Sequence, residues 1–187
     1  MYAFTVISCK KIPSTSLDSS FYGNYNFVQV TTAVSNTVTS FDGTDSTELT
    51  DSTNWVSGSN SGTVTVDNKS IMSRNILYSA DKVTYSYTYI DNELKGMSFN
   101  SYSDGILPTT GSSAFTVVTS DSIYFSNYPV FFHVNFNSTR PIGGKFKLIG
   151  STLYITMYQK DTAQTTQGGR NYTTINDAKV ITEFQKQ

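Results

Sequence analysis

The sequence predicts an all-β protein, an antiparallel meander that closes into a barrel of eight to ten strands. Three observations predict this fold. Val83 to Ile90 alternates apolar and polar residues with a period of two, which is the pattern of a half-buried strand. Turn signals recur between short apolar runs, and no segment has convincing helical periodicity. Because closure removes exposed edges, we expect a barrel, and a β-sandwich is the alternative.

The N-terminal third of the chain is expected to hold a tether, one helical turn, a first strand and a long polar stretch. Lys10 to Ser20 is rich in serine and holds Pro13, which is typical of a tether, and Asp18 is placed to cap one helical turn through Phe21. The first clear strand is predicted at Gly23 to Val34. Residues 35–62 are the longest polar stretch, either a long loop or a hairpin with ragged strands.

From Gly62 onward the pattern predicts a run of strands joined by short turns. Asp91-Asn92 is a turn signal, and Gly150-Ser151 is a two-residue hairpin link of the primed-turn type. Two polar segments, residues 103–113 and 161–177, are predicted as loops because they hold glycine or proline and few apolar residues. The strands are expected at residues 62–66, 70–78, 83–90, 94–101, 114–119, 122–125, 131–135, 145–149, 152–160 and 178–184.

The only cysteine of the chain, Cys9, follows a short apolar run and precedes two lysines. The run Val6-Ile7-Ser8-Cys9 resembles a lipobox, the lipidation signal of bacterial lipoproteins, and Cys9-Lys10-Lys11 resembles the start of many lipoproteins from the Bacteroidetes group. The resemblance implies that residues 1–20 hold the remnant of a signal, a lipidation site at Cys9 and a tether, followed by a β domain at 21–187. The alternative is a first strand, Tyr2 to Ser8, with a buried thiol.

Two further segments carry a family resemblance. Phe21-Tyr22-Gly23-Asn24-Tyr25 resembles the opening Gly-x-Trp motif of lipocalins, with Tyr25 in the place of Trp. Lys145 to Met157 resembles the late hairpin of bacterial lipocalin-like lipoproteins. The resemblance implies a lipocalin-like barrel that holds a small apolar ligand, in a protein of the cell envelope, in the periplasm or at the outer membrane. An extracellular location is the alternative.

Aromatic residues are the feature that favours binding. Tyr85, Tyr87 and Tyr89 share one face of a strand. We expect them to line a cup with rings from other strands, although rings that simply fill the barrel are an equal alternative. The only histidine, His133, lies in an aromatic segment, where a pocket position is favoured over a catalytic one. The predicted ligand-binding residues are Tyr25, Phe27, Tyr85, Tyr87, Tyr89, Phe99, His133 and Phe146.

Composition and motifs exclude several classes of function. A net charge of −1 with scattered lysines and arginines does not favour nucleic acid. One histidine and one cysteine do not favour zinc, and no nucleophile elbow or phosphate loop occurs, so neither enzyme activity nor a cofactor is expected. Acidic side chains with a spacing of three could bind calcium, but a solvated loop is the default. They are Asp42, Asp45, Glu48 and Asp51.

These observations together predict a non-enzymatic lipocalin-like protein, anchored to the membrane through lipid only. It is expected to bind a small hydrophobic or amphipathic ligand in an aromatic-lined barrel. The alternative function is a non-catalytic interaction module at a cell or virion surface with a β-sandwich fold. The order of the strands discriminates the two folds, because next-neighbour pairing is typical of the barrel and a Greek-key crossing of the sandwich.

Overall fold

The structure is a computed structural model that describes residues 16–132 and 142–187. Within these residues, nine strands form one antiparallel sheet, preceded by a short 3-10 helix, η1 (Ser19–Phe21). The strands are β1 (Gly23–Phe41), β2 (Ser46–Val56), β3 (Gly58–Val66), β4 (Ser70–Ile90), β5 (Glu93–Thr119), β6 (Ser122–Phe125), β7 (Ile142–Ile149), β8 (Thr152–Gln167) and β9 (Arg170–Lys186).

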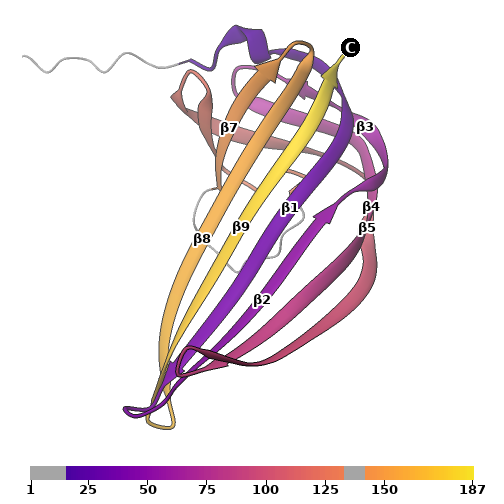
Figure 1. Cartoon of the computed structure of the whole chain (residues 1–187). Coiled ribbons are helices and arrows are strands. Elements are labelled where there is room, and N and C mark those ends of the chain that lie inside the picture. Colours follow the sequence, from indigo (N-terminus) through magenta and orange to yellow (C-terminus); the bar gives the residue numbers. More distant parts are fainter. Residues whose placement is uncertain (1–15, 133–141) are drawn as a thin grey trace, which may run out of the picture.

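The sheet closes into a barrel-like ring. From β3 to β9 each strand pairs with its neighbour in sequence, and β1 pairs with both β3 and β9, which completes a ring of hydrogen bonds through eight strands. Figure 1 shows the ring at the upper end of the molecule. This arrangement confirms the predicted all-β antiparallel meander. The alternative of a β-sandwich is wrong, because next-neighbour pairing forms one sheet rather than two layers.

Below the ring, six strands continue as a long sheet that we call the extension, formed by residues 31–56, 79–105 and 159–178. Here β2 lies between β1 and β4 and pairs with both. The three hairpin turns of the extension lie together at its lower end (Figure 1). Polar contacts join these turns: Arg170 Nη2 lies 2.7 Å from Asp42 Oδ2, and the backbone N–H of Asp91 donates to the carbonyl of Ser46 at 2.9 Å.

Several segments predicted as loops are strands. Within the stretch of residues 35–62, residues 35–56 form a hairpin of β1 and β2 and residues 58–62 begin β3, so the hairpin alternative is confirmed. Residues 103–113 continue β5, and residues 161–177 form the β8–β9 hairpin, so the loop predictions there are wrong. The turn signals were better guides: Asp91 and Asn92 have φ values of 51° and 65°, which is the conformation of a primed hairpin turn.

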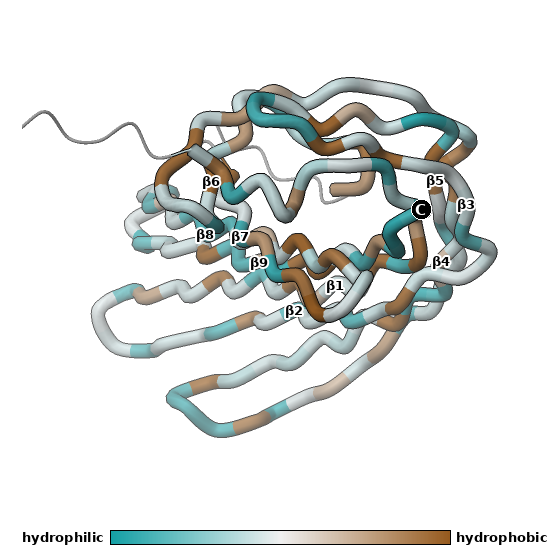
Figure 2. Tube along the Cα trace, turned by 90° about the horizontal axis from the view of Figure 1, so that it is seen from above, coloured by the Kyte–Doolittle hydropathy of each residue, from teal (hydrophilic) through white to brown (hydrophobic). Residues whose placement is uncertain are grey.

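The interior of the ring is one continuous hydrophobic core. Alternate residues of the strands contribute to it, and the change between apolar and polar residues along the strands is visible in the view from above (Figure 2). The upper end is covered by η1, whose expected cap is present: the Asp18 carboxylate accepts the backbone N–H of Ser20 at 2.9 Å. Leu17, which precedes η1, and Phe21, its last residue, are buried, so the packed unit begins before residue 21.

Candidate ligand-binding site

The register of the extension decides which side chains point toward the interior. Thr32 of β1 lies directly opposite Trp55 of β2, and both are buried. In the neighbouring ladder between β2 and β4, Asn54 pairs with Val83, so Lys82 falls on the face of Trp55. Since successive residues of a strand point to opposite faces, Tyr85 and the two tyrosines that follow it at a spacing of two point away from the interior. We call their side the outer face.

The predicted ligand-binding residues therefore fall into two separate groups. Tyr25, Phe27 and Phe146 are buried in the core of the ring. The second group, Tyr85, Tyr87, Tyr89 and Phe99, lies on the outer face of the extension. There the rings of Tyr85 and Phe99 are 6.4 Å apart between centroids. The two groups lie on opposite sides of one sheet, so they do not form a single cup. His133 and Cys9 lie outside the described residues.

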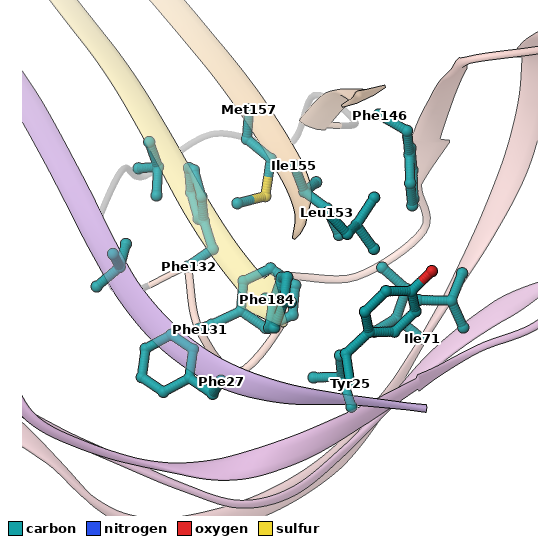
Figure 3. Close-up of a cluster of buried hydrophobic side chains, with 14 of the residues drawn as sticks. Tyr25, Phe27, Ile71, Phe131, Phe132, Phe146, Leu153, Ile155, Met157 and Phe184 are labelled. Atoms are coloured by element: carbon teal, nitrogen blue, oxygen red, sulfur yellow. The ribbon is translucent and has the colours of Figure 1, made fainter. Parts of the chain in front are cut away.

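Aromatic rings fill the interior of the ring. Phe131 and Phe132, from the segment after β6, lie among side chains of β1, β8 and β9 (Figure 3). The Phe131 ring meets the ring of Phe184 edge-on at 5.2 Å, and the Phe27 ring lies 6.0 Å from the same Phe184 ring. This packing favours the alternative in which the rings fill the barrel.

At the lower end of the core, a buried lysine is held between aromatic rings. The Lys82 ammonium lies 4.9 Å from the centroid of the Trp55 ring and 5.7 Å from that of Tyr102, which are distances of cation–π contact. Lys82 Nζ also lies 2.8 Å from Asp104 Oδ2. The lysine side chain is 8% exposed and the aspartate side chain 41% exposed, so the pair joins the core to solvent.

Three buried hydroxyl groups, including that of Thr182, have no hydrogen-bond partner in the described part of the chain, and two of the three lie beside this pair. These two belong to Thr32 and Tyr78, which flank Trp55: Thr32 opposes it in the ladder, and the Tyr78 ring stacks on it at 5.7 Å. Burial, followed by the charge of Asp104, raises the pKa of Tyr78 well above its usual range, so its hydroxyl stays protonated. An unpaired buried hydroxyl costs about 1–3 kcal/mol.

The buried hydroxyl of Tyr25, in contrast, has a hydrogen-bond partner. It donates to the carbonyl of Phe21 at 2.8 Å, and burial raises its pKa. The site at the lower end is therefore defined by Trp55, Tyr78, Lys82, Tyr102 and Asp104, and we call it the mouth site. Sequence reasoning missed all five. The available signals were the single tryptophan of the chain and a lysine directly before the alternating strand.

The mouth site combines apolar and polar side chains. It offers aromatic surface, one ammonium, one carboxylate and a hydroxyl. Within residues 16–132 and 142–187, no group of three or more His, Cys, Asp and Glu side chains is arranged to hold a metal ion. The acidic run expected as a possible calcium site does not converge. Asp42 organises a turn, and Glu48 and Asp51 lie on opposite faces of β2.

Comparisons with known proteins add no relative. No family model matches the chain, and neither the curated proteins nor the solved structures contain a match to it. In the described ranges, no helix has the length and hydropathy needed to cross a bilayer.

Proposed function

We propose that this protein is a non-catalytic binding protein that holds a small amphipathic molecule at the mouth site. The observation that carries the proposal is the fully buried Tyr78 hydroxyl, which lacks a partner beside the stacked ring of Trp55. Buried polar groups in proteins are almost always paired, and an exception calls for an explanation. A ligand that accepts this hydrogen bond recovers the cost of leaving the hydroxyl unpaired.

The surroundings match an amphipathic ligand because they combine apolar and charged groups. An alkyl chain or ring would pack against Trp55 and Tyr102, where each buried methylene contributes about 0.8 kcal/mol. A polar head would accept from the Tyr78 hydroxyl and from Lys82, whose ammonium has three donors. A carboxylate head would compete with Asp104 for Lys82, and the partial exposure of Asp104 allows water to solvate it when it is displaced.

Trp55 makes the proposal directly testable, because it is the only tryptophan and its emission reports the site. The protein is titrated with submicellar sodium laurate, with dodecyltrimethylammonium as the cationic counterpart. We expect saturable quenching or a spectral shift with laurate and a weaker response with the cation. Tyr78→Phe should weaken laurate binding about 2- to 10-fold, the worth of one hydrogen bond. An unchanged Trp55 spectrum at all laurate concentrations would exclude the proposal.

A second candidate function, a protein interaction module, is favoured by the edge of β5. In the described residues, β5 pairs with β4 along residues 93–114 but with β6 only at Phe115–Thr119, so a long edge carries backbone groups without a second strand. Phe99 and Leu107 on this edge are 69% and 81% exposed. Such an edge is a template for an added strand.

The β5 edge can pair with the same edge of a second copy of the chain, because two identical antiparallel strands are related by a two-fold axis. A two-fold antiparallel pairing centred on Ser98 would set Met97 against Phe99 of the second copy on the outer face, and it opposes no like charges. Sedimentation velocity over a range of protein concentrations should then show a dimer. Phe99→Lys should abolish it, whereas Ile149→Lys, a matched exposed position in the β7–β8 hairpin, should not. A monomer at every concentration would refute the pairing.

A further inference from the structure

The outer wall of the ring carries a groove of about 230 Å³ over β5, β6, β7 and β8. Its floor is formed by Gly143 and Gly144 of β7, and its sides by Tyr124 of β6 and Tyr158 of β8. Gly143 is the register partner of both tyrosines, one on each neighbouring strand. The two tyrosine backbones are therefore two strand spacings apart, about 9–10 Å, with no side chain between them.

Packing requires a glycine at one of the two floor positions but not at the other. Gly144 faces the core, where an added Cβ would lie 2.8 Å from the Phe125 ring, so packing requires a glycine there. Gly143 faces outward, and its nearest neighbour to an added Cβ would be Tyr124 Cε1 at 3.6 Å, an ordinary contact. Its φ is not in the left-handed region.

The fold therefore does not require a glycine at position 143. Glycine within a strand weakens the strand, and it often marks a place where a ligand approaches the backbone closely. Here the Tyr124 ring lies over part of the glycine, with Cε1 3.6 Å from the position of an added Cβ, and the groove lies between this ring and that of Tyr158. The two residues are 51% (Tyr124) and 55% (Tyr158) exposed.

The groove combines apolar sides with a polar rim. Tyr124, Tyr158 and Val118 supply apolar surface, while Ser122, Thr156 and Lys145 supply hydrogen-bonding groups at the edge. A pyranose ring has the matching form, with an apolar C–H face that stacks on an aromatic ring and hydroxyl groups around its circumference.

Three lysines and two aspartates lie around the groove, so one positive charge is in excess among these five residues. Lys145 makes a loose pair with Asp121 at 3.6 Å, and Lys160 makes one with Asp177 at 3.8 Å. Lys179 lies with its ammonium 5.7 Å from the centroid of the Tyr158 ring, and it is in none of the ion pairs among the described residues. A carboxylate on the sugar would complement this ammonium and the rim lysine.

We propose that this groove binds an acidic pyranose, a hexuronate unit of a glycan. The ring stacks between Tyr124 and Tyr158 above Gly143, and its carboxylate is held by Lys145 or Lys179. The site is separate from the mouth site and does not depend on the function proposed there, because Trp55 faces the interior and the groove is on the outer wall.

Saturation-transfer difference NMR with methyl β-D-glucuronide tests the proposal, with methyl β-D-glucoside as the uncharged counterpart. We expect saturation of the ring protons of the glucuronide and weaker transfer to the glucoside. Tyr158→Ala should weaken glucuronide binding about 3- to 10-fold, the range of an aromatic stacking contact. Tyr85→Ala, which removes an exposed tyrosine of the extension, should leave binding unchanged.

A side chain introduced at position 143 tests the groove most directly. Gly143→Val should abolish saturation transfer because its side chain occupies the space between the rings, and it should keep the thermal midpoint since valine favours strands. Gly143→Ala serves as a smaller change should the valine variant fail to fold. Absence of transfer to both sugars in the wild type, or transfer that persists in a folded Gly143 variant, would overturn the proposal. Equal saturation transfer to both sugars would overturn the proposed role of the sugar carboxylate.

Discussion

The ammonium group of Lys82 lies 4.9 Å from the centre of the Trp55 ring, and its only described ion-pair partner is the partly exposed Asp104. The pair is asymmetric because the cation is buried and the anion reaches water. The two ways of breaking it should therefore differ in cost.

We predict that Asp104→Asn is more destabilising than Lys82→Met. The first change leaves a buried charge without compensation, which costs about 3 kcal/mol, whereas the second leaves a carboxylate that water can solvate and costs about 1 kcal/mol. Urea denaturation of both variants measures the two free energies of unfolding. The asymmetry is refuted when the lysine variant is the less stable of the two.

Tyr78 and Tyr25 provide a matched pair of hydroxyl deletions. Tyr78→Phe should raise the free energy of unfolding by about 1 kcal/mol because it removes a buried hydroxyl that has no partner. Tyr25→Phe should lower it by about 1 kcal/mol because it removes the donor to the Phe21 carbonyl. Thermal and chemical denaturation of the two variants checks the opposite signs. Equal effects would show that the two hydroxyls have similar surroundings in solution.

Asp42 predicts a loss of stability in acid. Its carboxylate accepts hydrogen bonds from the backbone N–H groups of Asp45 and Thr44, from the Thr44 hydroxyl and from Arg170, and these bonds hold its pKa well below the ordinary 3.8. A folded-state pKa below the unfolded value stabilises the fold above about pH 4, and this stabilisation disappears as the pH falls through the folded value.

The free energy of unfolding of the wild type should accordingly fall with pH below about pH 4, and Asp42→Asn should reduce the slope. Arg170→Met should change the slope less, since the arginine is the last of the contributing causes. Denaturant titrations at several pH values measure these slopes. A slope unchanged by Asp42→Asn would show that the Asp42 turn does not contribute to the pH dependence of stability.

Gly105 is predicted to be intolerant of a side chain. It lies where β5 passes from the extension into the ring, and an added Cβ would lie 2.3 Å from the carbonyl oxygen of Tyr78, a backbone atom that cannot move freely. Gly105→Ala should lower the free energy of unfolding by about 2–3 kcal/mol.

Gly96 on the same strand is the control for Gly105. The nearest atom to its added Cβ is in Thr88 at 4.0 Å, so Gly96→Ala should change the stability by at most about 0.5 kcal/mol. The thermal midpoints of the two variants measure this difference. Similar midpoints would mean that β4 and β5 separate easily at this position.

The amino-acid sequence by itself determined the all-β class, the turn at Asp91-Asn92, the cap at Asp18 and the shared face of Tyr85, Tyr87 and Tyr89. These features depend on neighbours in the chain, where a period of two and a few turn residues are sufficient. The lipidation of Cys9 and the role of His133 stay predictions, because both residues lie outside the described ranges.

Only the tertiary structure decided that the tyrosine face points outward and that the polar segments 103–113 and 161–177 are strands. Alternation shows which residues share a face but not which face is buried, and that choice is shown by the burial of Thr32 and Trp55, which oppose each other across the sheet. Backbone hydrogen bonds between long neighbouring strands extend the ladder through polar residues, since the peptide groups that form them are the same whatever the side chains.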